Sequence, residues 1–275
     1  MSDVIVAKFG GSSLADSIQF TKVKDIVTAD KNRRYIIPSA PGKGKNQDYK
    51  VTDLLYMCYQ LASHSINIDD VFGIISKRYE DICKELNLDL NIEEVLSDIK
   101  SRIQDGASRD FTASRGEYLS AIILSKYLDY EFVDAKDLIL FDDEGKLNLE
   151  ETKKRIQSIL SNKSHAVIPG FYGANEDGEI ITFSRGGSDI TGSIIASAVN
   201  SQLYENWTDV SGFYMADPRI VANPRSIENI TYKELRELSY MGAPVLHEES
   251  IFPIKSNGIP INIRNTKASA NCEEI

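Results

Sequence analysis

The chain has 275 residues, 42% of them hydrophobic, which is enough apolar material for one large domain or two closely packed lobes. Its formal net charge of −10 argues against nucleic acid or an anionic membrane surface as a partner, since both bind basic faces. The chain has no basic-then-apolar leader and no membrane-length apolar run, and its three cysteines lack the spacing of a zinc site. These features predict a cytoplasmic enzyme with reduced thiols and no metal site built from its own side chains.

The N-terminal part of the chain predicts two strands, each followed by a glycine-containing turn or loop. Residues 4–9 form an apolar run that leads directly into Gly-Gly-Ser-Ser at 10–13, before an amphipathic helix at about 15–29. A second strand at 34–38 ends in a loop at 39–45 that contains both glycine and lysine. We expect this loop to lie beside the first turn.

Residues 52–104 predict a helical insertion. The pattern is helical throughout this stretch, with segments around 54–61, 71–86 and 93–103 and no strand signal between them. Such a block interrupts the alternation of strands and helices and is typical of an insertion or a lid.

Strand signals resume in the second half of the chain. They predict strands at 131–134 and 165–169, a hairpin of 171–172 with 180–183 closed by the turn 175–178, a strand at 202–207, a helix at 232–241 and a last strand near 259–263. Alternating apolar strands and helical patterns indicate a mostly parallel sheet with helices on both faces. The predicted fold is therefore α/β, a three-layer αβα sandwich with a helical insertion.

The run Arg185-Gly186-Gly187-Ser188-Asp189 lies between the hairpin and a predicted helix that starts near Ser188, which is the layout of an anion site. Glycines let backbone N–H groups approach a ligand, and the start of a helix carries positive dipole charge. The ordinary alternative is a plain helix start, with Ser188 as the cap and Asp189 offsetting the dipole.

A second candidate anion site is the turn at Gly10 and Gly11, which taken alone is usually only a tight connection. Lys8 precedes it near the end of the strand and favours a functional role, because a lysine there can hold a transferring phosphoryl group. Asp209 and Asp217 are open to either interpretation, since a turn aspartate can simply bind its own backbone. Two glycine-rich turns in one domain predict two anionic ligands held together.

The order and spacing of several blocks resemble the aspartate kinases, which belong to the amino-acid kinase superfamily. The blocks are Lys-Phe-Gly-Gly-Ser-Ser at 8–13, Ser-Arg-Gly-Glu at 114–117, Gly-Phe at 170–171, Arg-Gly-Gly-Ser-Asp at 185–189, Thr-Asp-Val-Ser-Gly at 208–212 and Asp-Pro-Arg at 217–219. The resemblance covers residues 4–265. Ser-Arg-Gly-Glu and the run from Thr208 to Arg219 are the parts most specific to aspartate kinases.

The resemblance implies ATP-dependent phosphorylation of the side-chain carboxylate of L-aspartate, giving 4-phospho-L-aspartate at the head of lysine, threonine and methionine biosynthesis. A carboxylate is already a nucleophile at neutral pH, so such an enzyme needs no general base and must hold two anions in line. By similarity, Lys8 stabilises the transferring phosphoryl group and Asp189 organises Lys8 and the nucleotide. The backbone of Gly10, Gly11 and Ser12 cradles phosphate oxygens.

The resemblance also implies how the two substrates are bound. Arg185 and Ser188 take the α-carboxylate of aspartate and Glu117 takes its ammonium group, with Ser39 and Thr52 completing the pocket. Mg²⁺ is expected to be held mainly by the ATP phosphates. The positions that match nucleotide contacts of the family are Thr208, Asp209, Tyr214, Asp217 and Arg219.

The sequence departs from the family at one ATP contact. Pro244 stands where many aspartate kinases have a lysine that helps to bind ATP. The loop between Ser39 and Thr52 is longer and richer in lysine than in some relatives, and Lys43 or Lys45 is a candidate to replace that lysine.

The resemblance implies a domain organisation as well. Residues 1–265 correspond to the catalytic domain, and its nucleotide-binding part spans about 170–265. By the same resemblance, residues 266–275 are expected to be the start of a linker to ACT regulatory domains, which the 275 residues do not include. A homodimer or higher homo-oligomer is also implied.

Two alternative functions remain open. The nearest is a kinase for another acid, such as glutamate or acetylglutamate, although Glu117 argues against an N-acylated substrate that has no ammonium group. The other is a non-catalytic subunit that only binds ATP or aspartate, which the proline at position 244 keeps open. The joint presence of Lys8, Glu117, Arg185 and Asp189 favours catalysis.

Overall fold

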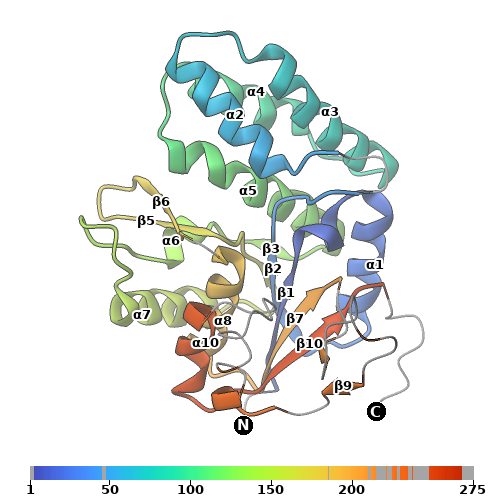
Figure 1. The fold of residues 1–275 in the computed structure, drawn as a ribbon, viewed down its shortest axis with the longest axis vertical. Coiled ribbons are helices and arrows are strands. Elements are labelled where there is room, and N and C mark those ends of the chain that lie inside the picture. The colour runs from blue at the N-terminus through green and yellow to red at the C-terminus, as the bar shows by residue number, and fades with distance from the viewer. Residues whose placement is uncertain are drawn as a thin grey trace.

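The computed structural model describes residues 3–44, 48–184, 186–209, 212–214, 221, 225–227, 230–234, 237 and 248–267. Within these residues a six-stranded sheet has the order β10-β7-β1-β2-β4-β3 (Figure 1). Every pairing between neighbouring strands is parallel, which confirms the predicted sheet. The strands are β1 (Ile5–Phe9), β2 (Arg33–Pro38), β3 (Glu131–Phe132), β4 (Ala166–Val167), β7 (Leu203–Thr208) and β10 (Ile261–Asn265).

Helices cover both faces of the sheet, because the side chains of a strand alternate between its two faces. On β1, Ala7 and Phe9 belong to the apolar core on one face, whereas Val6 belongs to the core on the other. The first core includes residues of α1 (Ser17–Thr28) and α5 (Arg109–Leu128), and the second includes residues of α6 (Ala135–Leu138), α7 (Leu149–Leu160), α8 (Gly187–Ala198) and α10 (Glu248–Lys255). The predicted three-layer αβα arrangement is confirmed.

The predicted helical insertion is present as α2 (Val51–Ser63), α3 (Asp69–Glu85) and α4 (Ile92–Gln104), which form the upper part of Figure 1. These helices pack together and on α5, and Leu55, Tyr79 and Ile99 are buried there. The sequence pattern does not predict α5, because most of its side chains are buried and it therefore shows no single apolar stripe.

Two short antiparallel pairs accompany the sheet. The predicted hairpin is confirmed as β5 (Tyr172–Ala174) and β6 (Ile180–Thr182), and β8 (Phe213–Tyr214) pairs with β9 (Ser226–Ile227). A single 3₁₀ turn, η1 (Gly11–Leu14), precedes α1. The last predicted strand, near 259–263, is present as β10 and begins two residues later, at Ile261. The helix predicted for 232–241 is helical at 232–234 and 237, and its other positions lie outside the described residues.

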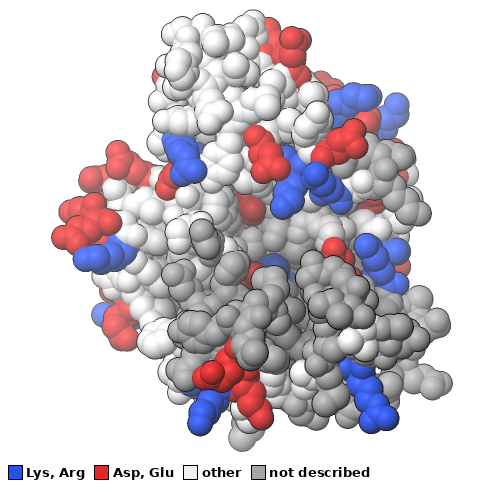
Figure 2. All heavy atoms as spheres, in the orientation of Figure 1, with Lys and Arg blue, Asp and Glu red and all other residues white. Residues whose placement is uncertain are grey.

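The described surface shows mixed charge. On the face in Figure 2, lysine and arginine side chains alternate with acidic ones, and acidic side chains gather at the left, over the β5–β6 hairpin and α7. Among the described helices, none combines the length and the apolar character that crossing a membrane requires.

A buried ion pair ties the middle of the sheet together. Arg33 of β2 and Glu205 of β7 lie on the strands that flank β1, and Arg33 Nε and Nη2 donate to the two carboxylate oxygens at 2.7 and 3.1 Å. Trp207 Nε1 and Arg264 also donate to Glu205. These donors together compensate the charge of the Glu205 carboxylate, which is almost fully shielded from water.

Replacing Arg33 with methionine is expected to lower the free energy of unfolding by about 3–5 kcal/mol, because it leaves Glu205 charged and buried with part of its network missing. The measurement is urea-induced unfolding of the wild type and the variant. Lys77→Met is the control, since the Lys77–Asp81 pair is exposed and such pairs contribute little. Equal stability of Arg33→Met and wild type would contradict this account.

Candidate active site

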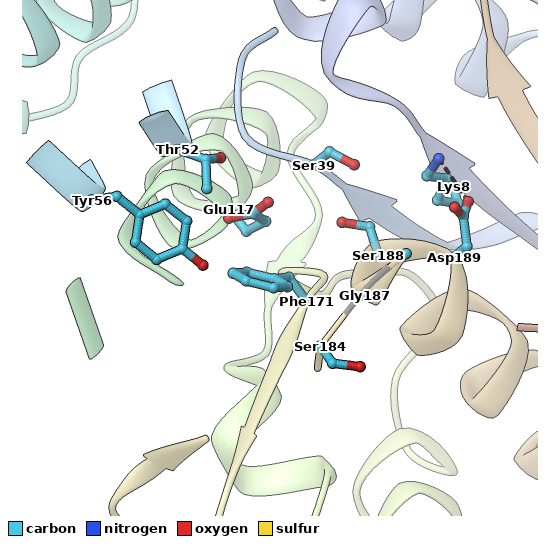
Figure 3. Close-up of a pocket in the computed structure, with 11 residues that line it drawn as sticks. Lys8, Ser39, Thr52, Tyr56, Glu117, Phe171, Ser184, Gly187, Ser188 and Asp189 are labelled. Atoms are coloured by element: carbon cyan, nitrogen blue, oxygen red, sulfur yellow. Dashed lines mark ion pairs between the residues drawn. The ribbon is translucent and has the colours of Figure 1, made fainter. Parts of the chain in front are cut away.

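A cavity of about 320 Å³ lies where β1, β2, α2, α5 and the start of α8 meet (Figure 3). In Figure 3, Lys8 and Asp189 stand at one end and Thr52 and Tyr56 at the other. The lining residues are Lys8, Ser39, Thr52, Tyr56, Glu117, Phe171, Ser184, Gly186, Gly187, Ser188 and Asp189. Residues that the sequence placed in substrate binding and catalysis therefore surround one space, although they are far apart along the chain.

The side chain of Lys8 faces α8 because successive side chains of β1 point to opposite faces of the sheet. Val6 belongs to the core beneath α8, so Lys8, two positions later, is on the same side of the sheet. Lys8 Nζ lies 2.7 Å from Asp189 Oδ1 in an ion pair that is mostly shielded from solvent. It also donates to Asn206 Oδ1 at 3.3 Å. The ammonium group is thus held at the cavity wall by two acceptors.

The start of α8 forms another part of the wall. Its N-cap is Gly186, whose φ of 58° is in the left-handed region, and no side chain caps the helix. The interpretation of Ser188 as the cap is therefore wrong, because Ser188 lies inside the first turn. A Cβ on Gly187 would lie 2.5 Å from Cδ2 of Phe171, so only glycine allows this close packing. The positive end of the twelve-residue helix is thus directed at the cavity.

Glu117 of α5 is the buried acidic group of the cavity. Its side chain is shielded from water, and its Oε2 has no hydrogen-bond partner among the described residues. Burial raises the pKa of Glu117 from 4.5 to about 8, while backbone N–H groups and the Arg115 guanidinium act in the opposite direction. A buried carboxylate oxygen without a partner is costly, and a cationic ligand would relieve that cost.

A second cavity, of about 430 Å³, adjoins the first and shares Ser39, Thr52 and Glu117 with it. Its other lining residues are Gly11, Ser12, Ala40, Pro41, Gly42, Lys43, Lys50 and Asp209. The loop after β2 therefore lies beside the turn after β1, as predicted.

Backbone and side-chain bonds hold these two loops together. Gly42 N donates to Gly11 O at 2.8 Å. The buried guanidinium of Arg78, on α3, donates to the carbonyl oxygens of Ala15 and Gly42 and to Tyr49 O. The helical insertion thus contributes directly to the position of both loops.

The structure does not bring every predicted residue to these two cavities. Gly10 N donates to Trp207 O, and Thr208 Oγ1 donates to Asp209; neither Gly10 nor Thr208 lines either of these two cavities. Tyr214 lies in β8, but its side chain is outside the described part of the chain. The residues that lie wholly outside the described part are Arg185, Asp217, Arg219, Lys45 and Pro244.

Sequence reasoning assigned no role to Tyr56, Phe171 and Ser184, which line the first cavity, or to Asn206, which contacts Lys8. Tyr56 follows Thr52 by one helical turn on α2, and this spacing could have indicated it. Ser184 lies just after β6 and has no such signal. Asn206 could not be identified from the sequence, because its position beside Lys8 depends on the register of β7 against β1. Among the described residues, no group of three histidine, cysteine or acidic side chains converges in the manner of a metal site.

The sequence model of the amino acid kinase family matches residues 3–265. The chain belongs to this family. Within the amino acid kinase family it is similar to aspartokinase 3 of Bacillus subtilis, with 39% identity over 95% of this chain and 61% of the relative. The match thus includes nearly all of the sheet, the insertion and both cavities.

Two solved structures of such kinases resemble the fold closely. The aspartate kinase of Clostridium acetobutylicum has 58% identity and a TM-score of 0.92, over 97% of this chain and 61% of that one. Aspartokinase III of E. coli, in a complex with aspartate and ADP, has 25% identity and a TM-score of 0.82, over 98% of this chain and 63% of that one. The chain therefore spans about three fifths of the length of the relatives it matches.

Proposed function

We propose that the chain is the catalytic domain of an aspartate kinase, which transfers the γ-phosphoryl group of Mg-ATP to the side-chain carboxylate of L-aspartate. The product is 4-phospho-L-aspartate, the first intermediate of lysine, threonine and methionine biosynthesis. The observation that carries the proposal is the placement of an unpartnered, buried carboxylate, Glu117, in one cavity with the start of α8 and the Lys8–Asp189 pair. The similarity to aspartate kinases over nearly the whole chain supports it.

The cavity suits a small molecule that carries both charges of a free amino acid. Glu117 Oε2 would accept a hydrogen bond from the substrate ammonium group. Ser188, in the first turn of α8, would bind the α-carboxylate together with Arg185. Ser39 and Thr52 line the same space and would complete the pocket. This polarity favours L-aspartate over an acid whose amino group is acylated.

Transfer of the phosphoryl group would take place at the Lys8 end of the cavity. A lysine has three N–H donors, and Lys8 gives one to Asp189 and one to Asn206, so one is left for a ligand oxygen. Its charge would stabilise the equatorial oxygens as negative charge redistributes in the transition state. Asp189 would keep the ammonium group in place. The attacking carboxylate needs no general base.

The nucleotide would be bound along the second cavity and β7. The backbone N–H groups of Gly11 and Ser12, which line the second cavity, would cradle phosphate oxygens, whereas the N–H of Gly10, also expected to do so, already donates to Trp207 O. Mg²⁺ would be brought in by the ATP phosphates and would neutralise their charge. Contacts to adenosine and phosphates are proposed for Thr208, Asp209, Tyr214, Asp217 and Arg219. The ADP bound to the E. coli relative supports nucleotide use by this fold.

The proposal also covers the bounds of the domain, its oligomeric state and its location in the cell. Residues 1–265 would form the catalytic domain, with the nucleotide part at about 170–265. Homodimers or larger homo-oligomers are expected, as is a cytoplasmic location, where ATP and aspartate are both present. The free, buried thiols of Cys58 and Cys83 fit a reducing compartment.

The test is ADP release from Mg-ATP by the purified chain, with L-aspartate, L-glutamate or N-acetyl-L-glutamate as the acceptor. The proposal predicts release with L-aspartate alone, because Glu117 needs a free ammonium group, which N-acetyl-L-glutamate lacks, and because the chain is similar to kinases of aspartate. Release with another acid would change the proposed substrate. ATP binding without turnover of any of the three acids would favour a binding subunit.

A further inference from the structure

Asn206 links the two charged residues of the phosphoryl-transfer end. It lies on β7 directly opposite Lys8 in the parallel register and is buried. Its Oδ1 accepts from Lys8 Nζ at 3.3 Å, and its Nδ2 donates to Asp189 Oδ1 at 2.9 Å. The amide therefore spans the ion pair between Lys8 and Asp189, in which the two atoms are 2.7 Å apart.

Chemistry fixes the orientation of this amide. An ammonium group can only donate hydrogen bonds and a carboxylate can only accept them, so the oxygen of Asn206 must face Lys8 and its nitrogen must face Asp189. Asn206 lines neither cavity, and any effect on a ligand must pass through these two neighbours. A neutral amide also leaves the net charge of the Lys8–Asp189 pair at zero.

The backbone of Asp189 is held by contacts that do not involve Asn206. Tyr204 Oη donates to Asp189 O at 3.1 Å. A Cβ on Gly192 would lie 2.5 Å from Tyr204 Oη, so α8 packs against β7 more closely than a side chain there would allow. Removing the Asn206 amide should therefore leave the helix in place and release only the side chains of Lys8 and Asp189.

We propose that Asn206 is a positioning residue for phosphoryl transfer. Its amide holds the Asp189 carboxylate and the Lys8 ammonium in one mutual orientation, so that the remaining N–H of Lys8 is directed at the ligand in the cavity. Transfer depends on this orientation more than substrate binding does, because it stabilises charge that moves in the transition state. The inference rests on the kinase activity proposed above.

The first test compares Asn206→Leu with the wild type. Leucine has the same branched arrangement of side-chain heavy atoms but cannot form a hydrogen bond to Lys8 or Asp189, and we expect kcat to fall about 10²-fold while KM for aspartate and for ATP each change less than about threefold. Asn206→Asp, which keeps the shape and adds a charge, should also lower kcat without a matching rise in KM. Asn206→Asp provides the same test of kcat if Asn206→Leu does not fold.

The matched control is Asn257→Leu. Asn257 also donates its amide to α8, to Ser197 O and Oγ at 3.1 Å each, but at the far end of the helix from the cavity. We expect its kcat to stay within twofold of the wild type. Asn206 variants with wild-type kcat, or an equal loss of kcat in Asn257→Leu, would overturn the positioning role.

A second readout does not need turnover. In ¹H–¹⁵N spectra the side-chain NH₂ signals of Asn206, identified by their loss in Asn206→Leu, should shift when Asp189→Ala removes their acceptor. Signals that do not move would overturn the pairing. If Asp189→Ala shifts these signals but the wild-type chain phosphorylates no acid, the kinase proposal is contradicted and the Asn206–Asp189 hydrogen bond is upheld. The failure of one proposal can therefore be told from the failure of the other.

Discussion

Replacing Lys8 with alanine is expected to lower kcat by at least about 10³-fold while the fold stays intact. Lys8 is a mostly shielded cation at the cavity wall, held by Asp189 and Asn206, and no other described lysine lines that cavity. Its charge is needed most when the phosphoryl group is between donor and acceptor. The loss corresponds to about 4 kcal/mol of transition-state stabilisation. It is measured by steady-state ADP release, with thermal unfolding as the check on the fold.

Asp189→Ala should give a similar loss, since Lys8 would lose its 2.7 Å partner and the freedom of its side chain would increase. Lys154→Ala is the control, because Lys154 lies on the exposed side of α7. We expect it to keep wild-type kcat. Near-wild-type turnover in either Lys8→Ala or Asp189→Ala would rule out the proposed transfer site.

Replacing Glu117 with glutamine is expected to raise KM for aspartate about 100-fold and to change KM for ATP less than about threefold. The substrate ammonium would lose the charge of its buried partner. Glu117 also borders the second cavity, but a carboxyl group there has no positive charge to offer the ATP phosphates, so ATP binding should change little. The measurement is the two KM values in the same assay. Glu94→Gln, on the exposed face of α4, is the control. Equal rises in both KM values would instead indicate a structural role for Glu117.

The raised pKa of Glu117 adds a pH signature to this prediction. With a pKa near 8 in the free protein, the carboxyl group is mostly protonated at about pH 7. An ammonium group favours the ionised form and lowers that pKa, so aspartate binding should release a proton. KM for aspartate should therefore fall as the pH rises from about 6 to about 8, and Glu117→Gln should lose this dependence. Calorimetry in buffers of different ionisation enthalpy measures the released proton, and its absence would contradict the assignment.

Much of the fold could be predicted because its strands are short apolar runs with clear turn residues after them. Lys8 and Ser188 were indicated by the glycine turn and the helix start beside them, whereas Ser39 and Glu117 were predicted only from the resemblance to aspartate kinases; all four line one cavity. The link between Asp189 and Lys8 was likewise predicted from the resemblance. The structure adds the distance between Lys8 Nζ and Asp189 Oδ1, 2.7 Å, which the sequence cannot give.

Other features depend on packing between distant segments. α5 could not be predicted from periodicity, because it is covered by the sheet on one side and by α2 to α4 on the other. The missing hydrogen bond of Glu117 follows from that burial. Asn206 has no local signal, since its role depends on the register of β7 against β1. Such contacts are fixed by the three-dimensional arrangement of the strands and helices.

The most direct test of the central claim is identification of the acyl phosphate. Purified chain is incubated with Mg-ATP, L-aspartate and hydroxylamine, and the trapped product is analysed by mass spectrometry against authentic α- and β-hydroxamates of aspartate. The account predicts aspartate β-hydroxamate, formed at the rate of ADP release and reduced at least about 10³-fold in Lys8→Ala. Release of ADP without β-hydroxamate, or equal formation by Lys8→Ala, would contradict it.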